Sequence, residues 1–403
     1  MNKKTIKNPF SQDFLKKFAL VPELLPFKDE EVVKLDKELS EYEHLFMNPE
    51  VERNLISKNE LLASFAISKA EESSLTLKEA QDVYNFVLQN NEYDFIRKKI
   101  KNKKKLTQKD YEKLEFFNIA KTFRKLNQEP FKIEKLSPNF IKNIHSQLTQ
   151  GLDVFHKYLP SFTVYKSGKW RDNDTIRVWG YKPPSYEKIP AGVKELIAWI
   201  KDNNSINGVA IFHTALYALH PFHNGNKRVC RILEHILFRG LGLNSKNLYS
   251  TSYYYHKQKD RYYKYLLYSI ERKNLNHFTS FVLEAVVLSI ISVLKTSLEI
   301  KRSEFLEKKI EDARIKLVLK PLIRRRELQF KTLFKISKKK IARQTFVSYL
   351  QRAVENKTLK KRKAGRAVYY RLNLQTPEDK VFKKWIDFTQ QRLSYLPYDI
   401  KLS

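Results

Sequence analysis

Hydrophobic side chains recur at helical spacing over most of the chain. Val229, Ile232, Leu233, Ile236 and Leu237, for instance, follow the i, i+3, i+4, i+7, i+8 pattern of an amphipathic helix. Similar spacing predicts further helices over residues 61–69, 78–89, 116–126, 137–148, 191–200 and 209–219. Several of these segments follow a serine or threonine, which are common helix N-caps. The pattern therefore predicts a mainly α-helical protein.

Two segments depart from this helical pattern. Residues 165–190 are rich in Gly, Asp, Asn and Pro and contain the strand-like run 175–179, which predicts a β-hairpin. Near the end of the chain, short periodic runs predict three short helices and then a two-stranded ribbon, over residues 326–334, 338–342, 345–354, 358–363 and 366–372.

Composition limits the class of protein. The chain has 403 residues, of which 42% are hydrophobic, so we expect two or three folded domains. A single cysteine, Cys230, excludes a disulfide framework and a cysteine-rich zinc site. The most apolar stretch, residues 281–294, contains Glu284 and is shorter than the ~20 residues of a membrane span, so we expect a buried helix. Residues 1–13 lack the apolar core of a signal peptide. We therefore expect a cytoplasmic protein without a membrane partner.

The charge is strongly basic and unevenly distributed. The net charge is +33, and residues 301–403 hold 29 basic and 10 acidic residues, which accounts for +19 of it. Such an excess favours a polyanionic partner, although a lysine-rich proteome would also produce part of it.

One central segment carries candidate chemistry. It reads His220-Pro-Phe-His-Asn-Gly-Asn-Lys-Arg-Val-Cys-Arg231, between two predicted helices. The second helix would begin near Asn226, where free backbone N–H groups and the helix dipole favour an anion. Lys227 and Arg228 add positive charge, and a histidine can act as a general base near neutral pH. These residues suggest a phosphate site beside a base, whereas the structural alternative is a capping histidine followed by a solvated basic turn.

The same segment resembles the Fic motif, which reads histidine-x-phenylalanine-x-acid-glycine-asparagine-glycine-arginine-x-x-arginine. The matching residues are His220, Phe222, Gly225, Asn226, Arg228 and Arg231. The predicted hairpin around residues 168–184, with Trp170 and Arg171 at its start, resembles the flap that aligns the target segment in Fic proteins. The resemblance covers roughly residues 40–295. It implies a Fic-type helical core with a β-hairpin flap.

The resemblance also implies an activity. His220 would deprotonate a Ser, Thr or Tyr hydroxyl of a target protein or of the chain itself, and that oxygen would attack the α-phosphate of ATP. AMP would be transferred with Mg²⁺ or Mn²⁺ present. The cradle of the α-phosphate would be Gly225, Asn226 and Lys227. Arg228 and Arg231 would neutralise the remaining phosphates.

Two positions depart from the family pattern. The acidic residue that binds the metal is Asn224 here, and an amide oxygen lacks the charge that favours Mg²⁺. The last glycine of the cradle is Lys227, as in the Doc branch, whose members transfer the terminal phosphate. AMP transfer is therefore the first expectation, Doc-like kinase activity the second, and a degenerate Fic domain the third.

A built-in brake is a further expectation. Many Fic proteins carry an inhibitory helix with the pattern Ser/Thr-x-x-x-Glu-Gly/Asn, whose glutamate pairs with the second motif arginine. Ser68-Lys-Ala-Glu-Glu72-Ser73 matches it loosely, so Glu72 would pair with Arg231. Glu71 is the alternative under a shift of one place. An exposed acidic helix end is the structural alternative.

The basic end of the chain resembles a winged helix-turn-helix. Residues 337–342 and 345–354 would be its paired helices, and lysines and arginines would contact nucleic-acid phosphates. A protein-binding role or a solvated ribbon remains open. The candidate DNA-contacting residues are Arg343, Gln344, Ser348, Arg352, Lys361, Arg362 and Lys363, with Tyr349 near the same face.

These features suggest five segments. They are an N-terminal helical region (1–105), a Fic core (106–298), a connecting helix (299–322), the winged module (323–376) and a C-terminal tail (377–403). The expected partners are ATP, a target protein hydroxyl and DNA, and a homo-oligomer is compatible with the sequence. A regulator that uses the C-terminal module, with the Fic part as a relic, is the competing hypothesis.

Overall fold

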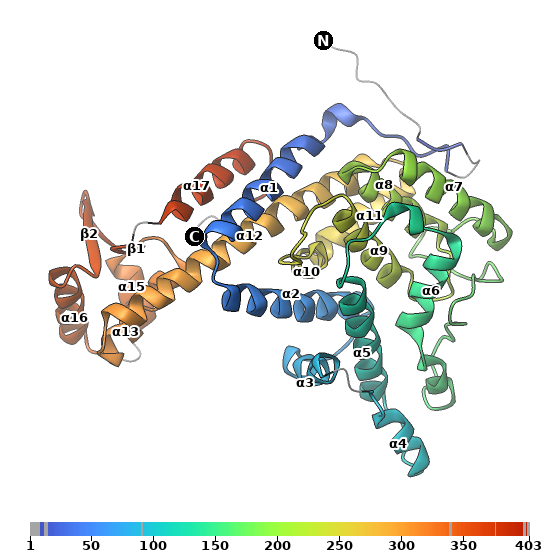
Figure 1. Cartoon of the computed structure of the whole chain (residues 1–403), viewed down its shortest axis with the longest axis horizontal. Coiled ribbons are helices and arrows are strands. Elements are labelled where there is room, and N and C mark those ends of the chain that lie inside the picture. Colours follow the sequence, from blue (N-terminus) through green and yellow to red (C-terminus); the bar gives the residue numbers. More distant parts are fainter. Residues whose placement is uncertain are drawn as a thin grey trace. The chain divides into compact units, whose positions relative to one another are not determined.

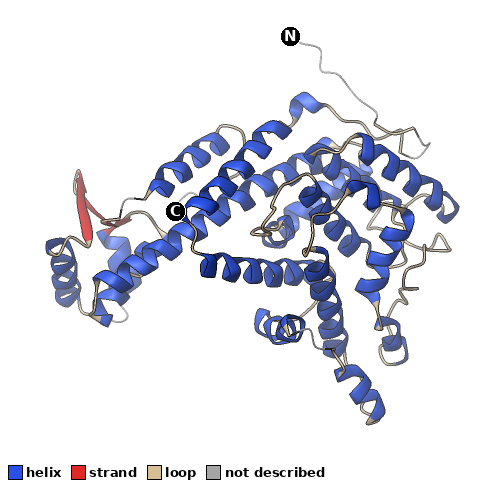
Figure 2. Cartoon of the chain, in the orientation of Figure 1, coloured by secondary structure: helices blue, strands red, loops and turns tan. Residues whose placement is uncertain are grey.

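The computed structural model describes residues 9–11, 15–89, 92–337, 341–374, 376–397 and 400. Helices dominate this part of the chain and a single small sheet lies near its C-terminal end (Figure 2). The chain divides into two compact units, residues 1–289 and 290–403. The helix α12 (Asn276–Lys309) begins in the first unit and ends in the second.

In the described residues of the first unit, helices make up the regular secondary structure, with loops and two isolated β-bridges between them (Figure 1). Its helices before α12 are α1 (Asp29–Phe46), α2 (Pro49–Lys69), α3 (Leu77–Leu88), α4 (Phe95–Lys101), α5 (Gln108–Leu126), α6 (Pro138–Thr149), α7 (Ile189–Asp202), α8 (Ile206–Leu219), α9 (Asn226–Gly240), α10 (Thr251–Lys257) and α11 (Lys259–Glu271). Four short 3-10 helices are η1 (Pro22–Leu24), η2 (Ile133–Lys135), η3 (Leu152–Lys157) and η4 (Tyr186–Lys188). The helices predicted from hydrophobic spacing in this unit are confirmed, but α2 begins at Pro49 rather than near residue 61, and α5 begins at Gln108 rather than near residue 116.

Side-chain caps fix where several of these helices begin. The Oγ1 of Thr76 accepts the N–H of Glu79, while the Glu79 carboxylate accepts the N–H of Thr76 at 2.8 Å. Thr107 and Asp110 form the same reciprocal pair at the start of α5. These capping boxes satisfy backbone donors that a helix leaves free at its first turn. They set the position of α5, which contributes buried polar side chains to the site described below.

The motif-bearing helices α8 and α9 form the centre of the first unit. Every residue of α8 except Asn207 is buried, and α9 is buried at almost all of its positions. The start of α12 packs on this centre, where Phe278 contacts the ring of His213 in α8, and residues 281–291 are all buried. α12 is long and apolar enough to cross a membrane by length and composition, but 83% of its most apolar window is buried inside the protein. The prediction of a buried helix over residues 281–294 is confirmed.

The predicted β-hairpin over residues 168–184 is wrong. Within this segment the structure shows only one bridge, in which Val178 and Tyr181 exchange two backbone hydrogen bonds of 3.0 Å around a tight turn. The side chain of Arg171 takes the place of a strand ladder, because its guanidinium donates to the carbonyls of Asn173 and Pro184. Pro183 and Pro184 also lack the N–H groups that a ladder needs. We keep the name flap for residues 168–184.

The second unit contains a three-stranded antiparallel sheet with the order β1-β3-β2. Its elements after α12 are α13 (Ala313–Leu319), α14 (Pro321–Arg324), β1 (Leu328–Gln329), α15 (Phe330–Ser337), α16 (Arg343–Glu355), β2 (Leu359–Ala364), β3 (Ala367–Leu372) and α17 (Pro377–Gln390). The core between helices and sheet includes Leu333, Phe346, Leu350 and Tyr370. The predicted two-stranded ribbon is confirmed as the pair β2–β3.

The helices predicted before that ribbon need correction. Residues 328–329 form a strand rather than helix, because they pair with Tyr369 and Tyr370 of β3. Residues 341–342 are not helical, and residues 338–340 of the predicted helix 338–342 lie outside the described residues. The helix that precedes α16 is therefore α15. Tyr349, expected near the exposed face of α16, is 8% exposed and belongs to the core.

Candidate functional site

The motif segment forms a short loop between α8 and α9. His220 follows the last residue of α8 in a left-handed conformation, with φ of 50°. Gly225, with φ of 80°, precedes the first residue of α9. A side chain at position 225 would be strained, and its Cβ would lie 3.4–3.5 Å from Arg228 and His145. The loop therefore holds the end of one buried helix against the N-terminus of another.

His220 is buried and its ring is oriented by its own helix. Its Nδ1 lies 3.3 Å from the carbonyl oxygen of Tyr217, which can only accept, so Nδ1 carries the proton and Nε2 has the free lone pair. Burial lowers the pKa of His220 to about 4, and the Tyr217 carbonyl opposes this shift. His220 is therefore neutral at physiological pH. This tautomer has the form that a general base requires.

Arg171 fastens the flap to the motif loop. Its Nε donates to the carbonyl of His220 at 2.9 Å, and its backbone N–H donates to the carbonyl of Pro221 at 2.8 Å. The same guanidinium forms an ion pair of 2.8 Å with Asp174, within the flap. The side chain is 1% exposed. Because one buried cation bonds both segments, the flap and the loop share a fixed geometry.

The two asparagines of the loop use their side chains locally. The amide of Asn226 donates to the carbonyl of Phe222 at 2.8 Å and accepts its N–H at 2.9 Å, which closes the loop. The Oδ1 of Asn224 accepts the N–H of Gly225 at 2.7 Å. The backbone N–H groups of Asn226, Lys227 and Arg228 occupy the first turn of α9, where a helix has no internal acceptors. These backbone groups can hold an anion.

The described residues fit a preformed metal site poorly. They contain no group of three or more His, Cys, Asp or Glu side chains arranged to hold a metal ion. The side-chain oxygen of Asn224 is neutral and already accepts a hydrogen bond. Mg²⁺ prefers one or two carboxylates together with substrate phosphates. We therefore derive no catalytic step through a metal.

Two cations of the motif contact the C-terminal end of α2. The Nζ of Lys227 lies 3.2 Å from the carbonyl oxygen of Ala70, and Nη1 of Arg231 lies 3.1 Å from that of Ala66. The carbonyls at a helix C-terminus lack internal donors and carry partial negative charge, so they attract cations. The guanidinium of Arg231 also lies over the ring of Tyr262, 4.4 Å from its centroid. Both side chains thus already contact protein groups, while Nε of Arg231 is buried without a hydrogen-bond partner among the described residues.

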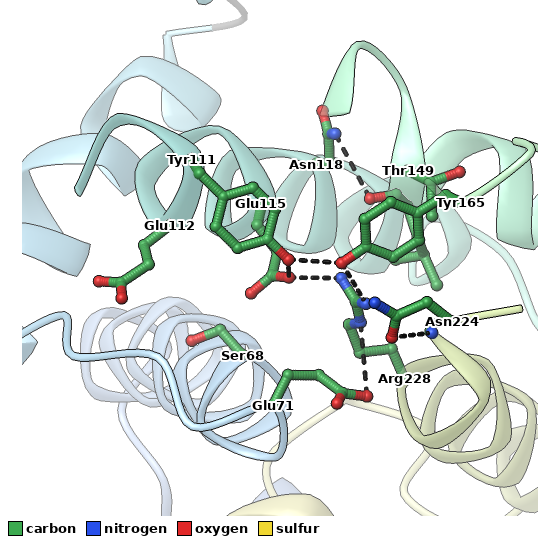
Figure 3. A network of polar contacts seen from close by, with 12 residues as sticks. Ser68, Glu71, Tyr111, Glu112, Glu115, Asn118, Thr149, Tyr165, Asn224 and Arg228 are labelled. Carbon is green, nitrogen blue, oxygen red and sulfur yellow. Dashed lines mark hydrogen bonds and ion pairs between the residues drawn. The ribbon is translucent and has the colours of Figure 1, made fainter. Parts of the chain in front are cut away.

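Arg228 belongs to a buried polar network rather than to the cavity wall (Figure 3). Its Nη1 donates to Glu115 of α5 at 2.5 Å, and its Nη2 donates to the hydroxyl of Tyr165 at 2.9 Å. Tyr111 donates to the same carboxylate at 2.6 Å and contacts the Tyr165 hydroxyl. Arg228 and Glu115 are at most 1% exposed. Burial raises the pKa of Glu115, and the charge of Arg228 opposes that shift.

The two candidate inhibitory glutamates point in different directions. Glu71 lies 3.6 Å from Nζ of Lys227 and 3.9 Å from Nε of Arg228, and Figure 3 shows its carboxylate directed toward Arg228. Glu72 adopts φ of 63°, and its side chain is 83% exposed, 3.8 Å from Lys259. Glu71 is therefore the carboxylate nearer to the motif cations. The described contacts of Arg231 include neither glutamate.

His145 of α6 connects the start of the flap to the motif loop. Its Nδ1 accepts the N–H of Gly168 at 3.0 Å, so Nε2 carries the proton and donates to the carbonyl of Asn224 at 3.1 Å. Its ring stacks on Phe222 with 3.9 Å between centroids. Burial lowers the pKa of His145 to about 3, so the ring is neutral. His145 thereby fixes the backbone at the residue before Gly225.

An open cavity of about 340 Å³ lies in front of the loop. Among the described residues, its lining includes His220, Asn224, Gly225, Asn226 and Lys227 but neither Arg228 nor Arg231. Other lining residues are Glu71, Glu72, Arg177, Val178, Trp179, Tyr217 and His223. A neutral histidine, a helix N-terminus and a lysine thus face one space. This arrangement can accept a proton next to a bound phosphate.

Three residues of this site were not identified from the sequence. Glu115, His145 and Arg171 act through contacts with residues 49 to 113 positions away in the chain. From the sequence, Trp170 and Arg171 are expected only to begin the flap. A buried charged or aromatic residue on an otherwise apolar helix face is a weak signal, and it is the one that Glu115 and His145 give.

The sequence model of the Fic/DOC family matches residues 135–238. The matched segment includes the whole motif loop with α8 and most of α9. A probable protein adenylyltransferase of Aquifex aeolicus is 28% identical over 135 residues. That alignment covers 32% of the present chain and 39% of the relative, so the chain matches about two fifths of the relative's length.

Solved structures of Fic proteins match this chain with low sequence identity and with TM-scores below 0.5. A Fic family protein from Desulfovibrio desulfuricans G20 is 18% identical, covers 87% of this chain and 99% of its own, and has a TM-score of 0.49. A fragment of Fic-1 from C. elegans is 17% identical, covers 66% of this chain and 72% of its own, and has a TM-score of 0.49. At these values neither likeness assigns a property to the present chain.

Proposed function

We propose that the chain is a protein adenylyltransferase, which transfers AMP from ATP to a Ser, Thr or Tyr hydroxyl of a target protein or of itself. The observation that carries this proposal is the neutral, buried His220 beside the N-terminus of α9, within a segment that matches the Fic/DOC family. The name of the relative from Aquifex aeolicus points to the same reaction.

The proposed reaction assigns each group a task. Nε2 of His220 takes the proton of the target hydroxyl, whose oxygen then forms a bond to the α-phosphorus of ATP. The bond from that phosphorus to the bridging oxygen breaks, and pyrophosphate leaves. The backbone N–H groups at the start of α9 bind the α-phosphate oxygens, and Lys227 lies beside them. Such fixed donors stabilise the charge that develops in the transition state.

The experiment uses ATP labelled separately at the α- and γ-phosphates. We expect transfer of the α-label to protein by the wild type and a loss of about 10²–10⁴-fold in His220→Ala, because general bases contribute about that much. His156→Ala is the matched control, since this histidine is exposed and outside the cavity lining. Equal labelling by wild type and His220→Ala would refute the proposed role.

Doc-like kinase activity is the second candidate. Its support is Lys227, which lines the cavity at the place where the Fic motif has glycine. The label experiment separates the two, because a kinase transfers only the γ-label.

We also propose that α2 restrains the enzyme. Lys227 and Arg231, the residues expected to contact phosphates, donate to carbonyls of α2 and of the residue that follows it, and Glu71 lies beside Lys227. A nucleotide has to compete with these contacts. Of the two candidate inhibitory glutamates, Glu71 lies close to Lys227 and Arg228, whereas the exposed Glu72 lies beside Lys259.

A DNA-binding role for the C-terminal unit is a separate proposal, in which it acts as a winged helix-turn-helix. Arg343, Gln344 and Arg352 of α16 are exposed and Ser348 is half-buried, while Lys361, Arg362 and Lys363 are exposed on β2. Arg362 is also bound by Glu327, at 2.6 Å. A charged ribbon next to an exposed helix face favours contacts to nucleic-acid phosphates.

A further inference from the structure

A second cavity, of about 240 Å³, lies within the C-terminal unit. Its wall comes from α12, α14, the segment before β1, the end of β3, the segment that follows β3 and the first turn of α17. The lining residues are Arg302, Leu322, Arg326, Arg371, Leu372, Leu374, Thr376, Asp379 and Lys380. None of its four cations belongs to the candidate DNA-contacting residues. The proposed DNA contacts therefore do not account for the cations of this cavity.

Among the described residues of this lining, the one carboxylate is already neutralised. Asp379 lies 3.1 Å from Nη2 of Arg302, whose side chain is 6% exposed, and also accepts the hydroxyl of Thr376 at 3.1 Å. Nη1 of Arg302 donates to the carbonyl of Ile323. This pair of the buried Arg302 and the half-buried Asp379 forms one wall of the cavity and leaves no net charge there.

The other three cations of the lining have no carboxylate in direct contact within the described residues. Arg326, Arg371 and Lys380 form no ion pair there. Three like charges around one concavity repel each other, and an anion placed between them relieves that repulsion.

The neighbouring carboxylates along the chain are engaged elsewhere. Glu378 pairs with Lys301, and Glu327 pairs with Arg362. The bond from Arg362 is the main cause that lowers the pKa of Glu327, and the charges of the lining arginines add to it from a longer distance. These carboxylates lie outside the lining, and Glu327 offsets only part of its positive charge from a distance.

We propose that this cavity binds a small phosphomonoester. A phosphate dianion matches the excess of positive charge, and arginine forks suit its oxygens. Leu322, Leu372 and Leu374 provide an apolar wall for the organic group that carries the phosphate. The cavity is somewhat smaller than the roughly 300–1,000 Å³ of sites for drug-sized ligands, which favours a compact molecule. A DNA backbone offers phosphodiesters, which carry only one negative charge each.

Binding to the full chain tests this proposal. The probes are phenyl phosphate, inorganic phosphate and phenol, measured by isothermal titration calorimetry. We expect saturable binding of phenyl phosphate, weaker binding of inorganic phosphate and none of phenol. Arg326→Gln and Lys380→Gln should each weaken phenyl phosphate binding by about tenfold, which corresponds to about 1.4 kcal/mol.

Matched controls remove the same charge outside the lining. Arg324→Gln lies two residues before Arg326, and Lys383→Gln lies one turn beyond Lys380 on α17, and both side chains are exposed. These two variants should bind phenyl phosphate like the wild type. Equal weakening by variant and control would show unspecific charge attraction and overturn the proposal. No binding of phenyl phosphate up to about 10 mM would also overturn it. If Lys380→Gln loses binding of a DNA duplex while the wild type does not bind phenyl phosphate, the cations of this cavity bind DNA instead.

Discussion

The ring of His220 has a different proton affinity from that of a histidine in water. Burial lowers its pKa from 6.5 to about 4, so it remains an unprotonated base in mildly acidic solution. For a reaction that needs neutral His220, kcat/KM should stay level as the pH falls through 6.5 and should decline only toward about 4. The measurement is the pH dependence of kcat/KM for label transfer, which reports the free enzyme. An acid limb centred near 6.5 would contradict the proposed environment of His220.

His145 should make the stability of the protein depend on pH. Its pKa is about 3 in the folded chain and 6.5 in the unfolded chain, so the unfolded state binds a proton first as the pH falls. Its contribution is complete above pH 6.5 and is lost toward pH 3, by about 1.4 kcal/mol per pH unit.

His145→Gln removes this titration while keeping a donor and an acceptor in the side chain. Denaturant unfolding of both proteins between about pH 7 and about pH 4.5 measures the difference in free energy of unfolding. We expect the wild type to lose stability relative to the variant as the pH falls. A constant difference would mean that His145 is solvated in the folded chain.

Among the residues of the site, the sequence predicted only those that lie in one continuous segment. His220, Gly225 and Lys227 could be found because they lie within twelve consecutive residues. The partners Glu115 and Arg171 could not, because their contacts depend on how α5 and the flap pack against the loop. The roles of Arg228 and Arg231 as phosphate ligands stay predictions, since both side chains contact protein groups here.

At the scale of elements, the contacts of Ala70 and Glu71, just after α2, with Lys227 of α9 should lower the proposed transferase activity. Glu71→Gln removes the charge beside Lys227, so nucleotide phosphates compete for that lysine more easily. We expect auto-labelling to rise by about tenfold, within the usual range of coupling free energies. Glu72→Gln is the matched control, because its carboxylate is exposed and directed at Lys259. A rise in Glu72→Gln alone would restore Glu72 as the brake.

The residue at position 224 of the motif loop should influence how label transfer depends on Mg²⁺. Asn224→Asp puts a carboxylate where the Fic motif has an acid, and charged oxygens bind Mg²⁺ more tightly than amides. The Mg²⁺ concentration for half-maximal label transfer should fall by roughly tenfold, or about 1.4 kcal/mol. Asn226→Asp serves as a structural contrast, because that amide must both donate and accept to close the loop. An unchanged metal requirement in Asn224→Asp would contradict this account.

Helices were predicted well and the flap was not, for a physical reason. An amphipathic helix repeats its pattern locally, so spacing and caps such as Thr76 define it. The flap is held by the side chain of one arginine, Arg171, which bonds to backbone groups that a strand partner would otherwise satisfy. Local sequence signals report turn residues but not which group satisfies the backbone.

For the whole molecule, the two units suggest two separable activities. Of the net charge of +33, the basic excess of residues 301–403 accounts for +19, and much of it lies on exposed side chains. If the C-terminal unit binds DNA as proposed, the logarithm of the association constant should fall linearly with the logarithm of salt concentration, by about 0.9 per phosphate contacted.

The variant Lys361→Gln should reduce that slope by about 0.9, because one phosphate contact is lost. Lys104→Gln removes an exposed lysine from the first unit and should leave the slope unchanged. Fluorescence anisotropy of a labelled duplex at several salt concentrations measures both. Binding that does not respond to salt would rule out the phosphate-contact proposal, and His220→Ala should bind DNA like the wild type.

The position of β2 in its sheet has a consequence for solubility. In the order β1-β3-β2 this strand is an edge, so one row of its backbone N–H and C=O groups is free to pair with another chain. The charges of Lys360, Lys361, Arg362 and Lys363 repel an identical strand and thus protect the edge from polymerising. Variants that neutralise several of them at once should self-associate, and light scattering will detect this as a rise in molecular mass.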